Sequence, residues 1–242
     1  MIRAVTFDFW GTLYVDGPHA RRRRRLREEY ARGFFLGNGY SLGRRQLSYA
    51  FEILFHDLER LRQVDQAGVT AEEAGQRLAR AMGIKLDPPD ACRLGELLSS
   101  AGREAPPVPA EGAGDVLSAL RGRVRLALIS DTGLTLGHDL YAVMEADGIA
   151  QLLDHFTFSN QTGTTKPMVR QFHHTLFRLG CRPEEAVHVG DLEETDVAGA
   201  HQAGMRAIRI VHPGADAATE ADAAVGSIPQ VLEVLREWGS TV

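Results

Sequence analysis

The sequence predicts an α/β protein in which helices cover both faces of a parallel sheet, with an all-helical segment inserted after the first strand. Three observations support this prediction. Residues 2–7 form an apolar run of strand length, and short apolar runs alternate with helical patterns from residue 106 onward. Between them, residues 15–105 show only helical patterns. We therefore expect a core of residues 1–14 and 106–242 and a separate helical domain of residues 15–105.

The inserted segment predicts four helices in order. Residues 18–36 read as a helix that starts with five arginines at residues 21–25. The apolar residues of the second helix recur at helical spacing between residues 47 and 61. Thr70 and Glu73 form a capping box that opens the third helix, and Pro88 and Pro89 begin a fourth, which we expect to end at about Ser100.

The second part of the core follows a proline-rich linker at residues 105–109. Strand and helix patterns then alternate, which favours a parallel sheet covered on both faces. The predicted helices are 113–121, 137–147, 169–179, 195–203 and 227–238, and the predicted strands are 124–129, 155–158, 186–189 and 206–211.

Composition narrows the classes of protein that fit. The chain has 242 residues, of which 44% are hydrophobic, and a formal net charge of −5. This charge gives no reason to expect nucleic acid or an acidic membrane surface as a partner. No run approaches the ~18 apolar residues of a membrane span, and the chain starts as a strand without a leader pattern. Two cysteines without metal-ligand spacing suit a reducing compartment, so we expect a cytoplasmic protein.

Polar residues stand where three predicted strands end. Asp8 follows the first strand, Ser130 ends the second, and Asp191 follows the strand at 186–189. Lys166 lies in the loop after the strand at 155–158. Active sites of parallel sheets lie at the carboxyl ends of the strands, so we expect these four residues to converge there.

The predicted cluster has the chemistry of phosphoryl transfer. Asp8 and Asp191, with Asp196 nearby, would place carboxylates close together, and such a group needs a cation. Oxygen ligands of this kind suit Mg²⁺. Lys166 and the hydroxyl of Ser130 would hold the anionic oxygens of a phosphoryl group. Each residue alone has an ordinary explanation as a turn residue, helix cap or surface lysine, but their order, spacing and strand positions agree.

The chain resembles the haloacid dehalogenase superfamily of hydrolases. Four pieces match its motifs in order: Asp8-Phe-Trp-Gly-Thr12, then Ser130, then Lys166-Pro167, then Gly190-Asp191 with Asp196. The helical segment has the position and length of the family's C1-type cap. The resemblance implies a Rossmann-like three-layer core, a mobile cap, Mg²⁺ and a covalent aspartyl intermediate.

The resemblance also implies a role for each matching residue. Asp8 would be the nucleophile and a metal ligand, and Lys166 would steady its charge. Asp191 would be the second metal ligand, supported by Asp196, while Trp10 would offer its backbone carbonyl to the metal. The residues expected to contact substrate are Thr12, Ser130, Asp131 and Lys166.

Trp10 departs from the family pattern and leaves alternatives open. Phosphatases of the family usually carry there an Asp that protonates the leaving group and activates water. An indole has no proton to transfer at neutral pH. Dehalogenases of the family carry a tyrosine, so an aromatic residue favours them mildly, whereas Asp191 and Asp196 resemble the Mg²⁺-dependent members. Phosphonate hydrolases use a cap lysine, and the one lysine in the helical segment is Lys85.

We therefore expect a Mg²⁺-dependent, phosphatase-like hydrolase of a small phosphorylated metabolite, acting as a monomer or homodimer. The alternatives are a metal-independent 2-haloacid dehalogenase and a weakly catalytic relative that binds a ligand or partner. Asp131, where the family often has Asn, adds an acid that must turn away from the phosphate or be protonated. Of the five arginines at residues 21–25, helical spacing allows only one or two to face a cleft.

Overall fold

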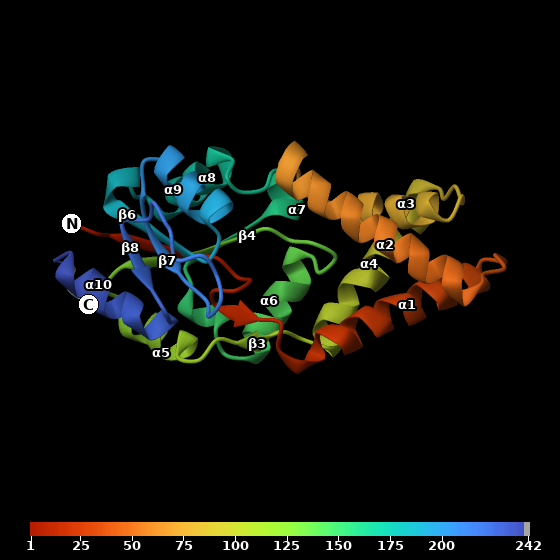
Figure 1. The fold of residues 1–242 in the computed structure, drawn as a ribbon, viewed down its shortest axis with the longest axis horizontal. Coiled ribbons are helices and arrows are strands. Elements are labelled where there is room, and N and C mark those ends of the chain that lie inside the picture. The colour runs from red at the N-terminus through yellow and green to blue at the C-terminus, as the bar shows by residue number, and fades with distance from the viewer. Residues whose placement is uncertain (240–242) are drawn as a thin grey trace.

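The computed structural model describes residues 1–239 and contains a six-stranded parallel sheet (Figure 1). Its strand order is β5-β4-β1-β6-β7-β8, and every neighbouring pair is parallel. The predicted α/β fold is confirmed. The strands are β1 (Ala4–Phe7), β4 (Arg125–Ser130), β5 (His155–Phe158), β6 (Ala186–Gly190), β7 (Arg206–Ile210) and β8 (Ala223–Val225).

Helices cover both faces of this sheet and make a three-layer, Rossmann-like core. Strand residues alternate between the faces, so that Val5 and Phe7 pack into one apolar cluster and Ala4 into the other. The first cluster is shared with α5 (Ala113–Leu120), α6 (Gly137–Ala146) and α10 (Val231–Glu237). The second is shared with α8 (Val169–Leu179) and α9 (Ala198–Gln202), which lie across the sheet in Figure 1.

Three short strands were missing from the sequence prediction. β8 adds a sixth strand at the sheet edge, and β2 (Tyr14–Val15) pairs with β3 (Val108–Pro109) in a separate antiparallel ribbon. Runs of two or three residues carry too little periodicity to be recognised. The remaining elements are single helical turns: η1 (Gly17–His19), η2 (Leu61–Asp65), η3 (Ala150–Leu152), α7 (Ser159–Thr162), η4 (Pro183–Glu185), η5 (Glu193–Val197) and η6 (Ile228–Gln230).

Residues 17–104, which we call the helical block, fold around their own apolar cluster. The block contains α1 (Ala20–Gly37), α2 (Arg44–Arg60), α3 (Ala71–Ala81) and α4 (Pro88–Glu104). The predicted capping box of α3 is present, and Asp87 caps α4. The prediction that the fourth helix ends at about Ser100 was wrong, because α4 runs one turn further to Glu104. No helix in the described residues is long and apolar enough to cross a membrane.

The helical block contacts the core on two sides. On one side α4 packs on α6, where the Ser99 hydroxyl accepts a hydrogen bond from the amide of Leu136 at 2.8 Å. On the other side the backbones of 66–68 and 163–165 form a short antiparallel bridge. There the amide of Thr165 donates to the Gln66 carbonyl at 2.9 Å, and the amide of Gly68 donates to Gly163 at 3.2 Å. The second contact lies immediately before Lys166.

Replacing Gly68 by alanine should weaken the second contact. A Cβ there would lie 1.9 Å from the carbonyl oxygen of Ser159, so the two backbones must separate. We expect the free energy of unfolding to fall by about 1–3 kcal/mol, as for other overpacked sites. Amide hydrogen exchange at Thr165 should also become faster.

Gly33→Ala in α1 is the matched control, because nothing lies within 4 Å of its added Cβ. It should raise the free energy of unfolding by about 0.5–1 kcal/mol, since alanine is the better helix former. Unchanged exchange at Thr165 in Gly68→Ala would contradict the assignment of this contact.

Candidate active site

The carboxyl ends of three adjacent strands carry the polar residues singled out from the sequence. β4, β1 and β6 are neighbours in the sheet, and Ser130, Asp8 and Asp191 stand at their ends. The structure therefore brings these three residues to one edge. Lys166 joins them from the loop after α7, next to β5, the other neighbour of β4.

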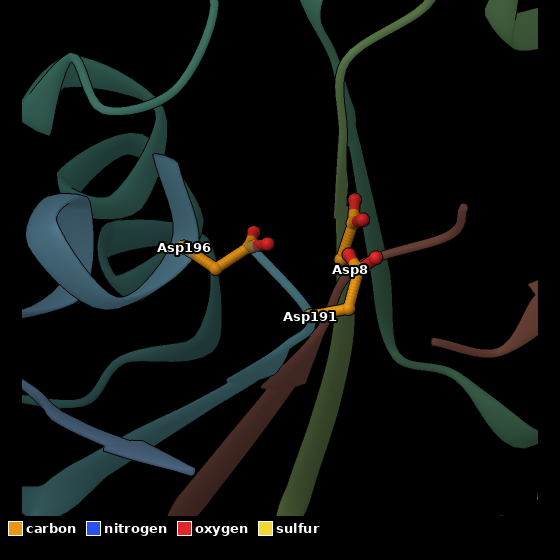
Figure 2. Close-up of side chains that lie close together, drawn as sticks. All are labelled: Asp8, Asp191 and Asp196. Carbon is orange, nitrogen blue, oxygen red and sulfur yellow. The ribbon is translucent and has the colours of Figure 1, made fainter. Parts of the chain in front are cut away.

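Lys166 is buried between two carboxylates. Its Nζ lies 2.5 Å from Oδ1 of Asp8 and 2.6 Å from Oδ1 of Asp196, and all three residues are at most 5% exposed. Asp8, Asp191 and Asp196 each offer an oxygen within 4.8 Å of the others. Figure 2 shows Asp8 and Asp191 at the ends of their strands and Asp196 reaching towards them from the following helical turn.

The charges in this cluster do not balance. Burial alone would lower the pKa of Lys166, but the charges of Asp196 and Asp8 outweigh it and raise that pKa. Lys166 is thus held protonated. Burial and the neighbouring Asp196 raise the pKa of Asp191 to about 6, and burial also raises the pKa of Asp8. One ammonium faces three carboxylates, which is the electrostatic environment that favours binding of a further cation.

Asp196 is fixed by neighbours that the sequence did not reveal. The ring of His188 lies with Nε2 3.1 Å from Oδ1 of Asp196, and the amide of Leu192 donates to Oδ2 at 3.0 Å. Burial lowers the pKa of His188, so the ring is neutral. With its proton on Nε2, the ring donates to Asp196 and accepts from the hydroxyl of Thr6 at Nδ1, 2.8 Å away. The sequence feature that could have pointed to this contact is a histidine inside an otherwise apolar strand.

Three buried polar atoms of the site have no hydrogen-bond partner. They are the hydroxyls of Thr12 and Ser130 and Oδ1 of Asp191. Buried polar groups are normally paired, so unpaired ones at a strand edge mark a place where a ligand completes the set. Two hydroxyls suit phosphoryl oxygens, and a carboxylate oxygen suits Mg²⁺. The residues present therefore fit both a phosphoryl group and a Mg²⁺ ion.

Gly11 brings the first loop close to Asp191. It adopts a φ of +71°, and a Cβ there would lie 2.3 Å from Oδ2 of Asp191. Both the backbone conformation and the space therefore require glycine. The ring of His212 fixes the same loop, with Nε2 2.7 Å from the Gly11 carbonyl oxygen.

Asp131 does not point freely at the site. Its Oδ1 accepts hydrogen bonds from the backbone amide of Lys166 and from Nε2 of Gln171, both at 3.0 Å. Gln171 also donates to the Thr164 carbonyl at 2.6 Å. Asp131 thus positions the loop that carries Lys166. Burial raises the pKa of Asp131, although Lys166 acts in the opposite direction.

A cleft of about 330 Å³ lies between the core and the helical block. Trp10, Asp131 and Thr165 form its core side, each within two residues of Asp8, Ser130 or Lys166. Of the five arginines at residues 21–25, only Arg23 lines this cleft, as helical spacing allows. Its guanidinium carbon lies 5.5 Å from the centre of the Trp10 ring.

Arg23 also ties together the two connections of the helical block. It forms an ion pair with Asp16, where the chain enters the block, and donates to the carbonyl of Ala105, where the chain leaves, at 2.8 Å. Trp10 therefore lies beside the two connections between the helical block and the core. Trp10, at the position where the resemblance predicted an acid in a phosphatase, thus forms part of the cleft wall.

Lys85, the lysine of the helical segment, and Glu193, an acid two residues after Asp191, lie away from the cleft lining. Lys85 is exposed at the far end of α3 and α4, beside Arg80 and Pro88. Glu193 is engaged by Arg209 at 3.2 Å and by the hydroxyl of Thr219 at 2.6 Å. Neither residue contributes to the cleft.

Comparisons with known proteins find relatives over most of the chain. The family model described as a haloacid dehalogenase-like hydrolase matches residues 2–204. A ribulose-1,5-bisphosphate 5-phosphatase of Halopiger xanaduensis is 29% identical over 213 residues, or 86% of this chain and 84% of that protein. A glyceraldehyde 3-phosphate phosphatase of Methanothermobacter thermautotrophicus is 41% identical over 63 residues. That match spans 26% of this chain and only 28% of the relative's length.

Solved structures show the same fold. A 2-haloacid dehalogenase from Pseudomonas syringae pv. Tomato superposes with a TM-score of 0.73 and 24% identity, covering 98% of this chain and all of the other. A phosphatase of the superfamily from Thermococcus onnurineus gives a TM-score of 0.68 with 20% identity, covering 97% of this chain and 98% of the other. Both classes of enzyme share this architecture.

Replacing Lys166 by methionine should destabilise the protein, chiefly when no divalent cation is present. The change leaves Asp8 and Asp196 buried without a counter-charge, and breaking a buried pair costs about 3–5 kcal/mol. Mg²⁺ should raise the melting temperature of Lys166→Met more than that of the wild type, because a second cation replaces the lost charge.

The exposed Lys85→Met is the matched control and should melt within a degree or so of the wild type in chelator, as surface changes usually do. If Lys166→Met melts at the same temperature as Lys85→Met in chelator, the ammonium does not hold this cluster together.

Proposed function

The chain belongs to the haloacid dehalogenase-like hydrolases, and we propose that it is a Mg²⁺-dependent phosphatase of small phosphorylated substrates. The observation that carries this proposal is the single ammonium of Lys166 among the buried carboxylates of Asp8 and Asp196 and the half-buried carboxylate of Asp191, beside unpaired hydroxyls of Thr12 and Ser130. The phosphatase names of the two curated relatives support it.

In this proposal Asp8 and Asp191 hold Mg²⁺, together with the backbone carbonyl of Trp10. Both oxygens of Asp196 already accept hydrogen bonds, so Asp196 supports the site by fixing Lys166 and the chain at Leu192. When bound, Mg²⁺ would neutralise negative charge on the phosphoryl oxygens. The unpaired Oδ1 of Asp191 is the atom that fits this role.

The proposed reaction has two displacements at phosphorus. A carboxylate oxygen of Asp8 forms a bond to phosphorus while the bond to the leaving oxygen breaks, giving an aspartyl-phosphate and an alkoxide or phenolate. Water then attacks the same phosphorus while the bond from phosphorus to the Asp8 oxygen breaks, which releases inorganic phosphate and the Asp8 carboxylate. One proton of that water is balanced by the proton that the alkoxide or phenolate takes up from solvent. Lys166 stabilises the charge on Asp8 and, with Ser130 and Thr12, holds the phosphoryl oxygens in place.

We further propose that the helical block is a cap that shields this reaction from water. The cleft it forms with the core is at the small end of ligand pockets, which suits a small metabolite. The two contacts of the helical block with the core, at α6 and at 163–165, would then open and close, with a hinge at the two connections that Arg23 joins. A cytoplasmic monomer or homodimer is the form we propose for this enzyme.

A metal-independent dehalogenase is the second candidate, because Trp10 places an aromatic ring where the phosphatase acid is expected. That enzyme would also use a carboxylate nucleophile on this fold. It would not need Asp191, whose half-buried carboxylate lies close to Asp8 and whose Oδ1 has no hydrogen-bond partner. Metal dependence therefore separates the two candidates.

Asp191→Asn should abolish the binding of Mg²⁺ that calorimetry detects in the wild type and should reduce phosphatase activity to the level seen in chelator. The reason is the loss of one of two negative ligands. Glu194→Gln is the matched control, since Glu194 is exposed and outside the three-carboxylate cluster. Hydrolysis of a 2-haloacid that survives both chelator and Asp191→Asn would favour the dehalogenase instead.

The wild type should hydrolyse p-nitrophenyl phosphate far faster than alkyl phosphates. Trp10 supplies no general acid, which is typically worth about 10²–10⁴-fold, and an aryl leaving group needs none. Aspartyl-phosphate should accumulate, visible as a burst of nitrophenol, because no base at this position activates water. Trp10→Asp should raise the rate with alkyl phosphates selectively.

Trp10→Phe keeps an aromatic wall and serves as the control for loss of the ring. Efficient turnover of an alkyl phosphate by the wild type would contradict the prediction. Asp131, the acid on the core side of the cleft, would then be the first residue to replace.

A further inference from the structure

One buried cation in the cleft has no role in the proposed reaction. Arg27 lies one helical turn after Arg23 on α1 and is 8% exposed. It lines the cleft together with Trp10 and Asp131. Its Nε donates to the carbonyl of Leu98 at 3.1 Å, and its Nη2 donates to the hydroxyl of Thr135 at 2.7 Å. Both acceptors are uncharged.

The other arginines of the cleft wall are already neutralised. Arg23 pairs with Asp16. Arg62 makes a two-pronged pair with Glu59, with distances of 3.1 Å from Nε and 2.7 Å from Nη2. Among the described residues no carboxylate forms an ion pair with Arg27, and its Nη1 has no hydrogen-bond partner. Burying an unpaired charge is costly, so its presence in a cleft wall calls for a partner.

We propose that Arg27 binds a second anionic group of the substrate, a carboxylate or a second phosphate, at the end opposite the phosphoryl group that reacts. This proposal rests on the proposed function and names its substrate class: small phosphate esters that carry a further negative charge. Arg27 is thus a specificity-determining residue of the helical block.

The geometry of the cleft supports the assignment. Its core side lies next to Asp8, Ser130 and Lys166, and Arg27 comes from the opposite side, on α1. The two hydrogen bonds to Leu98 and Thr135 fix the guanidinium before any ligand arrives, so that little side-chain entropy is lost on binding. Burial and Arg23 lower the pKa of Arg27 to about 9, and the group is still charged at neutral pH.

Calorimetry with non-hydrolysable phosphonates tests this inference. In the presence of Mg²⁺, the wild type is titrated with phosphonoacetate, 3-phosphonopropionate and 4-phosphonobutyrate, and with alkylphosphonates of matched length. We expect at least one carboxylated probe to bind about ten- to a hundredfold more tightly than its alkyl match, the contribution of one charge-assisted hydrogen-bonded pair. A further titration with propane-1,3-bisphosphonate shows whether a probe with a second phosphonate binds more tightly than a probe with a carboxylate.

Arg27→Met should lose this preference, so that the carboxylated probe binds no better than its alkyl match, while Arg27→Lys should retain part of it. Arg25→Met, an exposed position on the same helix, is the matched control and should keep the full preference. Thermal melting of each variant shows that it is folded. A preference that persists in Arg27→Met, or that is missing from the wild type although both probe series bind, overturns the inference and leaves the phosphatase proposal intact.

If neither series binds to the wild type, the phosphatase proposal fails, and the anion site is then decided separately. In a Trp238→Phe background Trp10 is the only tryptophan, and it lines the same cleft. Succinate should change the fluorescence of Trp10 in this background and should leave it unchanged when Arg27→Met is added. An equal response in both proteins overturns the anion site.

Discussion

The carboxyl edge of the sheet depends on one ammonium group held between two buried carboxylates. Lys166, Asp8 and Asp196 come from two loops and a helical turn that are far apart in the sequence, and the Lys166 ammonium lies within 2.6 Å of an oxygen of each carboxylate. Taking these charges out of water is costly, and the cost is offset only while all three remain together. The ion-pair cluster thereby fixes the relative positions of these segments, and it leaves Oδ1 of Asp191 without a hydrogen-bond partner.

Much of this arrangement could be predicted from the sequence, since a parallel sheet obeys simple rules. Apolar runs gave the strands, and the polar residue at the end of each run gave Asp8, Ser130 and Asp191. What surrounds them could not be predicted in this way. His188 stands in a strand like any other buried residue, and only the three-dimensional structure places its ring against Asp196. Likewise, helical spacing shows that Arg23 and Arg27 share a face of α1, but not what that face meets.

Asp131 illustrates how an unfavourable residue in the sequence becomes useful in the fold. Taken alone, a further acid beside a phosphate site is repulsive. In the structure its carboxylate accepts hydrogen bonds from the backbone of Lys166 and from Gln171, and so it holds the lysine loop. The helix that supplies Gln171, α8, packs under the sheet. Contacts with the packed core therefore help to set the position of the lysine.

The bridge between 66–68 and 163–165 consists of backbone hydrogen bonds, apart from the Thr165 hydroxyl, which donates to the Arg62 carbonyl at 3.3 Å. Backbone pairing is largely independent of side-chain identity, provided that the close approach at Gly68 is kept. Residues of α1 and α2 that line the cleft can consequently diverge without disturbing the alignment of the lysine that directly follows the bridge. If the helical block recognises the substrate as proposed, its ligand preference can change while the catalytic core is kept, because this contact beside the lysine is made by peptide groups.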